Sequence, residues 1–150
     1  MVHEIDKSAV VTAVNEAYTQ YAKTTEGQNA SYIPYLKNIP PSLFGISVCM
    51  ADGERIEVGD TGYRFGIESV SKVPTAILAM KQHGTQTVMK KIGADATGLP
   101  FNSIIAILLE NDHPSTPLVN AGAITACSMI APTGNSDAKW LAIKGFVESL

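Results

Sequence analysis

The chain has 150 residues, of which 45% are hydrophobic and 17% are charged, and its formal net charge is -3. This length fits one domain with its own core, and the low charge excludes a disordered chain. The 11 Lys and Arg residues are scattered through a mildly acidic sequence, so we expect no nucleic-acid and no membrane partner. Charges near the N-terminus and the lack of a long apolar run predict a cytoplasmic protein without a signal peptide.

The first part of the chain predicts a helix followed by a loop. Apolar residues recur at helical spacing over residues 6–23, and Asp6 or Ser8 can cap the start of this helix. Residues 24–42 are rich in Gly, Asn, Ser and Pro, which is typical of a loop.

A β-hairpin is predicted next. Residues 43–50 are rich in strand-forming side chains, and residues 54–58 alternate between polar and apolar. Asp52-Gly53 lies between these two segments and predicts a type I′ turn.

The middle of the chain predicts two consecutive helices. The first covers residues 72–83 and ends at Gly84, a residue type that is common just after a helix. The second covers residues 85–92. We expect the apolar face of the first helix to consist of Val73, Ile77, Leu78 and Met80.

The last third predicts two further helices and one ambiguous segment. The run IIAILL after Ser103 fits either a helical turn or a buried strand. Pro117 suits the first turn of a helix that reaches about Ile130. Ser136 is expected to cap a final amphipathic helix, which reaches the end of the sequence at Leu150.

The two cysteines, Cys49 and Cys127, each stand in an apolar run. We expect two buried free thiols in a reducing compartment, although a disulfide between them is also compatible with the sequence. Neither cysteine belongs to a Cys-x-x-Cys or a His-rich pattern, so no zinc site is predicted.

Two Ser-x-x-Lys patterns are candidates for a serine nucleophile with its own base. Ser136 and Lys139 are explained by a helix start, because Ser136 follows a turn and precedes an acidic residue. Ser69 and Lys72 stand between a short extended segment and an apolar helix. The alternative for this second pair is an ordinary helix cap with a solvated lysine.

The Ser69–Lys72 spacing suits acyl-transfer chemistry. Residues three apart lie on one side of a helix, so Lys72 can reach the Ser69 hydroxyl. If Phe65, Val70 and Val73 bury the Lys72 ammonium, the neutral amine is favoured and can accept the serine proton. Pro74 lacks an N–H group, so we expect a tight or irregular first turn and a regular helix from about Lys72.

Several motifs occur in an order that resembles the serine-dependent glutaminases, which include bacterial enzymes and the catalytic domain of the animal kidney and liver enzymes. The resemblance covers residues 27–130. The motifs are YIPYL from Tyr32, LFGISVCMADG from Leu43, GDTGYRF from Gly59, ESVSKVP from Glu68, GLPFNS from Gly98 and PLVNAGAI from Pro117.

This resemblance implies hydrolysis of L-glutamine to L-glutamate and ammonia, without a cofactor or a metal. The family's nucleophile and base match Ser69 and Lys72, and its substrate-binding tyrosine and asparagine match Tyr32 and Asn120. Taken alone, Tyr32 could be a loop anchor and Asn120 a polar helix start. Family members form homodimers or homotetramers, so we expect a homo-oligomer. The role of Glu68 stays open, because the family has glutamine or glutamate there.

The implied fold class is α/β and resembles β-lactamases and penicillin-binding proteins, with an antiparallel sheet flanked by helices and a helical subdomain. Residues 1–150 are expected to be the N-terminal portion of one catalytic domain. Residues 1–68 would hold the opening helix, loop and hairpin, and residues 69–150 the motif helix and helical subdomain. Because the family continues beyond this length, we expect this stretch alone to be poorly active. A catalytically incompetent binding fragment, or a β-lactamase or peptidase relative, are the alternatives.

Overall fold

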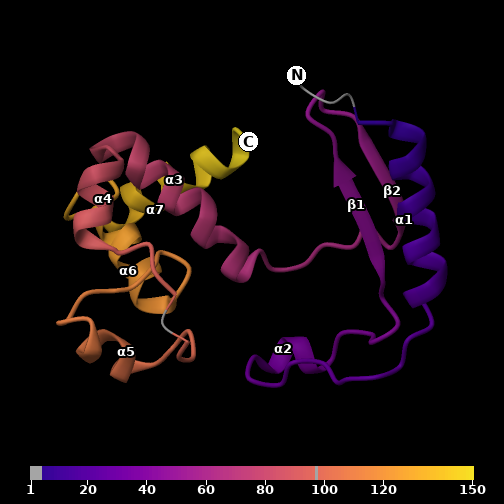
Figure 1. Ribbon diagram of the computed structural model, residues 1–150, viewed down its shortest axis with the longest axis horizontal. Helices are drawn as coiled ribbons and strands as arrows, with labels where there is room; N and C mark the ends of the chain where they lie inside the picture. The colour runs from indigo at the N-terminus through magenta and orange to yellow at the C-terminus, as the bar shows by residue number, and fades with distance from the viewer. Residues whose placement is uncertain (1–4, 97) are drawn as a thin grey trace. The chain divides into compact units, whose positions relative to one another are not determined.

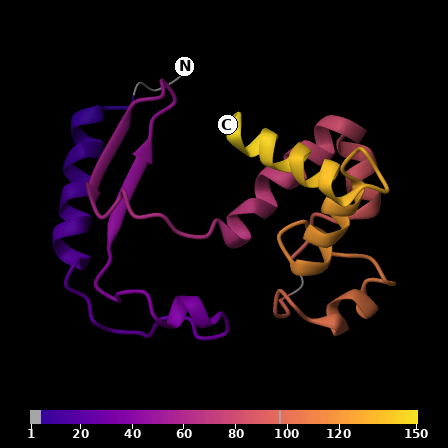
Figure 2. The same cartoon turned by 180° about the vertical axis from the view of Figure 1, so that it is seen from behind.

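The computed structural model describes residues 5–96 and 98–150, and the chain divides into two compact units. The first unit ends at Phe65, and the second begins at Gly66. Figure 1 shows the first unit as a helix beside a two-stranded sheet and the second as a group of helices, and Figure 2 shows the same elements from behind.

The first unit is built on a helix that packs against a β-hairpin. Helix α1 begins where the Asp6 carboxylate accepts hydrogen bonds from the backbone N–H and the hydroxyl of Ser8, which confirms the predicted cap. The apolar face of α1 buries Val14, and the hairpin buries Ile56. The elements of this unit are α1 (Lys7–Tyr21), α2 (Pro34–Lys37), β1 (Gly45–Cys49) and β2 (Arg55–Gly59).

The hairpin itself is confirmed, but its turn differs from the predicted type I′ turn. Strands β1 and β2 pair antiparallel from Gly45 opposite Gly59 to Cys49 opposite Arg55. The N–H of Gly53 donates to the carbonyl of Met50 at 2.9 Å, and only Gly53 within this loop has positive φ, at 89°. A type I′ turn needs positive φ at both central residues, whereas a three-residue loop needs it only at the last, where glycine is favoured.

The second unit is helical. Helices α3, α4 and α6 surround an apolar cluster, and α7 packs against α3. The buried members of the cluster are Ala79, Val88, Ile92, Ala126 and Ile130. The elements are the 3-10 turn η1 (Glu68–Ser71), α3 (Lys72–His83), α4 (Thr85–Lys91), α5 (Ile104–Leu109), α6 (Asn120–Met129) and α7 (Ser136–Glu148).

Helix α3 confirms the predicted ends and half of the predicted face. Its regular part begins at Lys72 after a tight turn, as Pro74 indicates, and it ends before Gly84, which has φ of 79°. The buried side chains are Pro74, Thr75, Ala76 and Ala79. Val73 and Ile77 are 49% and 38% exposed. Leu78 and Met80 are half-buried and pack against the core, as predicted. The small alanines allow α6 to approach α3 closely, so they take the place that was predicted for Val73 and Ile77.

Three helix starts in the second unit refine the sequence predictions. The segment IIAILL is a helix, and the Ser103 hydroxyl caps it by accepting from the N–H of Ala106. Helix α6 begins at Asn120, not at Pro117 as predicted, because the chain is extended at the preceding Val119. The cap of α7 is Asn135, not Ser136: the Asn135 side chain accepts from the backbone of Ala138 at 2.9 Å.

Both cysteines are free thiols, but the prediction that both are buried is wrong. Cys49 is exposed, because the alternation along β1 turns it to the side opposite Ile46 and Val48. Cys127 is half-buried in α6.

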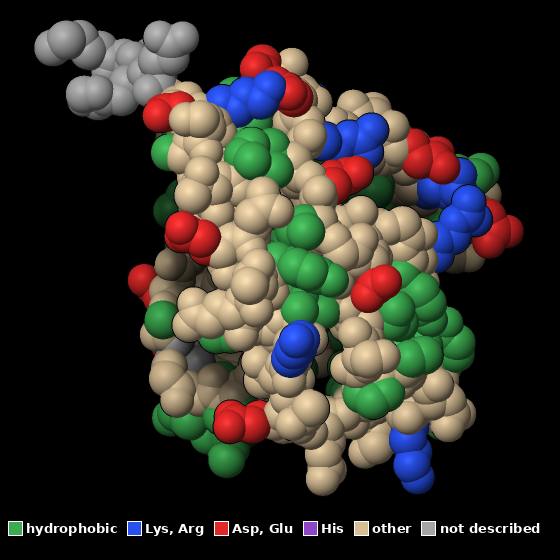
Figure 3. Space-filling view, turned by 90° about the vertical axis from the view of Figure 1, so that its right-hand side faces the viewer, with side chains coloured by type: hydrophobic (Ala, Val, Ile, Leu, Met, Phe, Trp, Pro, Cys, Tyr) green, Lys and Arg blue, Asp and Glu red, His purple; other side chains and the backbone are tan. Residues whose placement is uncertain are grey.

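The surface shows no concentrated charge of one sign on the face seen in Figure 3, where acidic and basic side chains are interspersed. Within residues 5–96 and 98–150, none of the helices has the length and apolar character needed to cross a bilayer.

Candidate active site

The first residue of α3, Lys72, is the centre of a polar cluster in the second unit. Its backbone N–H donates to the carbonyls of Ser69 and Val70, which joins η1 to α3 without a break. Its Nζ donates to the backbone carbonyl of Leu118 at 3.1 Å and to Oδ1 of Asn120 at 2.8 Å. The structure therefore brings together two of the predicted site residues, which are 48 positions apart in the sequence.

A third contact to Lys72 comes from the segment that precedes α5. The Nζ atom lies 5.6 Å from the centroid of the Phe101 ring, within the range of a cation–π contact. The backbone carbonyl of Phe101 also accepts a hydrogen bond of 3.0 Å from the N–H of Asn120. The motifs that begin at Glu68, Gly98 and Pro117 thus meet at the Lys72 amine.

Ser69 lies in the η1 turn, one turn before Lys72, and its side chain is exposed. The preceding residue, Glu68, has φ of 41°, a left-handed conformation that is uncommon for residues other than glycine. The Ser71 hydroxyl donates to the Glu68 carbonyl at 2.5 Å, and the Thr75 hydroxyl donates to the Ser71 carbonyl at 2.8 Å. Ser71 therefore links the η1 turn to the first turn of α3 by hydrogen bonds.

The apolar shell expected around Lys72 is not formed by the predicted residues. Val70 and Val73 are 65% and 49% exposed, and Phe65, which is 79% exposed, belongs to the first unit. Helical spacing explains the difference, since Lys72 lies three and four residues before the buried Thr75 and Ala76. The half-buried Lys72 is consequently surrounded by backbone carbonyl, amide and aromatic groups, and its amine is oriented by hydrogen bonds.

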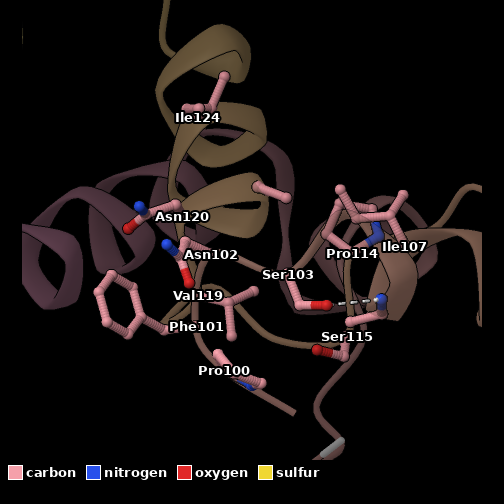
Figure 4. Close-up of a pocket in the computed structure, with 12 residues that line it drawn as sticks. Pro100, Phe101, Asn102, Ser103, Ile107, Pro114, Ser115, Val119, Asn120 and Ile124 are labelled. Carbon is pink, nitrogen blue, oxygen red and sulfur yellow. Dashed lines mark hydrogen bonds between the residues drawn. The ribbon is translucent and has the colours of Figure 1, made fainter.

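Asn120 is the first residue of α6 and also lines a pocket. A Cβ atom on Gly122 would lie 1.9 Å from the carbonyl oxygen of Thr116, so only glycine lets the first turn of α6 approach this segment. The pocket has a volume of about 210 Å³. Figure 4 shows Asn120, Asn102 and Phe101 at the same end of it. Its other lining residues are Pro100, Ser103, Ala106, Ile107, Pro114, Ser115, Val119, Ala121 and Ile124.

Tyr32 belongs to the first unit, on the loop before α2, and it is 75% exposed. Tyr35, in the same YIPYL motif, forms a side-chain hydrogen bond with Tyr63 of the GDTGYRF motif. The hydrogen bond with Tyr35 favours the protonated phenol and so raises the pKa of Tyr63 above 10.0. The YIPYL and GDTGYRF motifs are therefore connected within this unit by a tyrosine pair.

The second Ser-x-x-Lys pattern has a structural explanation. Ser136 is the first residue of α7, and Nζ of Lys139 donates to the carbonyl of Ser128 at 2.8 Å, which attaches α7 to α6. Among the described residues, no group of three or more His, Cys, Asp or Glu side chains is arranged to hold a metal ion.

Sequence reasoning missed two partners of Lys72. The Leu118 acceptor is a backbone carbonyl, which no residue type reveals. Phe101 stands in the motif that begins at Gly98, but an aromatic residue between proline and asparagine does not indicate contact with a lysine.

The comparisons agree on one family. A family model described as Glutaminase matches residues 27–150. A glutaminase of Parabacteroides distasonis is 62% identical over 150 residues, an alignment that covers 97% of this chain and 47% of the relative.

Two solved structures are similar as well. One, described as probable glutaminase ybaS, is 45% identical with a TM-score of 0.92, and the match covers 97% of this chain and 47% of that one. The other, described as a probable glutaminase from Bacillus subtilis complexed with 6-diazo-5-oxo-L-norleucine, is 28% identical with a TM-score of 0.71, and the match covers 100% of this chain and 43% of that one. The chain thus spans about half the length of these relatives and corresponds to the N-terminal portion of the glutaminase structures.

Proposed function

Because this chain belongs to the glutaminase family, we propose that it supplies the nucleophile and the base of an enzyme that hydrolyses L-glutamine to L-glutamate and ammonia. The observation that carries this proposal is the 2.8 Å hydrogen bond from Nζ of Lys72 to Oδ1 of Asn120. It links the proposed base to a proposed substrate-binding residue, one turn from Ser69. Acyl transfer requires these groups to be close together.

In the proposed first step, the hydroxyl oxygen of Ser69 attacks the side-chain amide carbon of glutamine. The neutral amine of Lys72 accepts the hydroxyl proton as the new C–O bond forms. When the tetrahedral intermediate collapses, the C–N bond breaks and the resulting Lys72 ammonium returns a proton to the leaving nitrogen. Ammonia departs, and the glutamyl group remains as an ester on Ser69.

In the second step, water hydrolyses the ester with the same groups in reverse order. Lys72 accepts a proton from the attacking water, and the ester C–O bond then breaks. The proton passes to the Ser69 oxygen, and L-glutamate is released. One lysine can serve both steps because it ends each of them in its starting protonation state.

The hydrogen bonds of Lys72 suit this role. A neutral lysine amine has two N–H bonds and one lone pair, and the carbonyl of Leu118 and Oδ1 of Asn120 can accept the two N–H bonds. The lone pair is then left for the Ser69 hydroxyl. In the ammonium form the same acceptors stabilise the positive charge and leave the third N–H for the leaving group.

Substrate recognition is assigned to Tyr32 and Asn120. Their hydroxyl and amide groups can bind the α-amino and α-carboxylate groups of L-glutamine. The complex of the Bacillus subtilis relative with 6-diazo-5-oxo-L-norleucine, a compound with the same amino-acid end, supports a substrate of this class. The chemistry requires no cofactor.

We further propose that the β1–β2 hairpin is part of a larger antiparallel sheet of the β-lactamase and penicillin-binding-protein type. In this view residues 1–68 and 69–150 are two portions of one catalytic domain. The rest of the domain would come from the half of the family's fold that this chain does not span, including part of the oxyanion site. The complete enzyme is expected to be a cytoplasmic homodimer or homotetramer.

Because this chain spans only about half the length of its relatives, one alternative function stays open: the chain could bind ligand without turnover. A β-lactamase or peptidase relative is disfavoured, because the sequence lacks both Ser-Asp-Asn and Lys-Thr-Gly.

The test is covalent labelling of the purified chain by 6-diazo-5-oxo-L-norleucine, followed by intact-mass measurement and peptide mapping. We expect one adduct on Ser69, no adduct in Ser69→Ala, and an unchanged adduct in the matched control Ser136→Ala. Glutamate release from glutamine, measured on the same samples, separates an enzyme from a binding fragment. If Ser69→Ala is labelled as strongly as the wild type, the proposed nucleophile is wrong. If the wild-type chain forms no adduct, the half of the fold that it does not span is restored and the labelling repeated; a restored protein without an adduct on Ser69 refutes the proposal.

A further inference from the structure

We propose that Phe101 is a positioning residue for Lys72, an inference that rests on the proposed function. Three groups contact the Lys72 amine: the Leu118 carbonyl, the Asn120 side chain and the Phe101 ring. The first two are hydrogen-bond acceptors that orient the amine. The ring is 61% exposed and is not a member of the buried core, so packing alone does not explain its place.

The ring face suits the charge that the proposed mechanism creates. Nζ of Lys72 lies 5.6 Å from the ring centroid, and the negative face of an aromatic ring attracts an ammonium ion more than a neutral amine. Lys72 becomes cationic when it takes the proton of Ser69. Phe101 therefore favours the state in which the tetrahedral intermediate forms, and it keeps the amine from turning toward solvent.

The backbone of the same residue holds a second part of the site. The Phe101 carbonyl accepts the N–H of Asn120 at 3.0 Å, and Asn120 in turn accepts from Lys72 at 2.8 Å. Phe101 thus reaches Lys72 by two routes, directly through the ring and indirectly through Asn120. Figure 4 shows Phe101 and Asn120 at the same end of the pocket.

The chain contains a matched control for the ring contact. Nζ of Lys81 lies 5.2 Å from the centroid of the Phe146 ring, a similar lysine–phenylalanine pair within the second unit. Lys81 is not assigned a role in the proposed reaction. Removing each ring separately shows whether an effect on a lysine is local to its own ring.

The experiment measures how fast each lysine of the 150-residue chain is acetylated by limiting acetic anhydride, with peptide mass spectrometry as the readout. Acetylation needs a neutral and accessible amine, so loss of the ring should accelerate it. We expect Phe101→Leu to raise the rate at Lys72 about two- to five-fold, which corresponds to about 0.5–1 kcal/mol for an exposed cation–π contact. Phe101→Tyr keeps a ring and should restore the wild-type rate. Phe146→Leu should raise the rate only at Lys81.

Three outcomes would overturn the inference. The rate at Lys72 could stay unchanged in Phe101→Leu while Lys81 responds to Phe146→Leu. Phe101→Leu could accelerate both lysines equally, which indicates general loosening of the fold. Phe101→Tyr could react as fast as Phe101→Leu, in which case the ring does not hold the amine.

A measurement on the wild-type chain covers the case in which Phe101→Leu fails to fold. The ring current of Phe101 should shift the ε-methylene protons of Lys72 upfield of those of Lys144, which pairs with Glu148; equal shifts would contradict the contact. Failure of the proposed function can be distinguished from failure of this inference, because the first is measured by labelling of Ser69 and the second by acetylation of Lys72. If Ser69→Ala is labelled as strongly as the wild type but Lys72 responds as expected, the proposed nucleophile is wrong and the contact stands.

Discussion

The close approach at Gly122 gives the sharpest prediction about the site. In Gly122→Ala the new Cβ would lie 1.9 Å from the carbonyl oxygen and 2.7 Å from the carbonyl carbon of Thr116, and 3.0 Å from Cα of Pro117. Since carbon–oxygen contacts in proteins are rarely closer than about 3.3 Å, the two backbone segments must separate by about 1.4 Å. All three atoms belong to the backbone, so no side-chain rotation can relieve the contact.

The expected cost follows from the packing. Inserting a methyl group into a filled space destabilises proteins by about 1–3 kcal/mol, and the higher helix propensity of alanine offsets only part of this, about 1 kcal/mol or less. The net cost of about 1–2 kcal/mol should lower the midpoint of thermal unfolding of Gly122→Ala by about 2–8 °C. Displacement of the first turn of α6 should also weaken the bond between Lys72 and Asn120, and so slow the labelling of Ser69.

Gly145→Ala is the matched control, monitored by circular dichroism in the same thermal scan. Gly145 lies in α7, and its added Cβ would meet no atom within 4 Å. Only the propensity gain remains, so this variant should be more stable than the wild type by about 0.5–1 kcal/mol. The reasoning is refuted if Gly122→Ala unfolds at the same temperature as Gly145→Ala.

Three further predictions concern the first unit and the thiols. Tyr35→Phe removes the hydrogen bond that favours the protonated phenol, so the pKa of Tyr63 should fall toward 10.0, as read by absorbance at 295 nm; an unchanged titration would contradict the tyrosine pair. Hydrogen bonds from the start of α1 lower the pKa of Asp6 below 3.8, so its stabilising effect is present above pH 3.8 and is lost as the pH falls through the lowered value. Asp6→Asn should retain the cap and lose this acid dependence in far-ultraviolet circular dichroism, and equal acid curves for the two proteins would refute the assignment. A thiol reagent should modify Cys49 faster than Cys127, because Cys49 is exposed and Cys127 is half-buried; a fast phase that survives in Cys49→Ser would show the opposite order.

The sequence predicted well those features that depend on local chemistry. Pro74 indicated an irregular turn before Lys72, and Gly84 indicated the end of the same helix; both are confirmed. Asp6 caps the helix that follows it, as its side chain suggests.

Features that depend on contacts between distant segments were harder to predict. The core face of α3 is only half predicted, because apolar residues surround the helix. Leu78 and Met80 pack against the core as expected, but close packing selects Ala76 and Ala79 instead of the larger Val73 and Ile77. The pairing of Lys72 with Asn120 follows from the packing of α3 on α6, which helical periodicity does not reveal. The family motifs supplied what local patterns could not, because they indicated that the two residues serve one site.

The left-handed backbone at Glu68 has a consequence for engineering. A residue with a side chain costs about 1–2 kcal/mol in this conformation, whereas glycine adopts it freely. Selection for heat resistance alone would therefore favour Glu68→Gly, which relieves the strain but frees the backbone beside Ser69. Under the proposed function, a backbone held rigid beside the nucleophile favours retaining the side chain and its stability cost. Position 68 is thus a place where a thermostability screen and an activity screen should choose different residues.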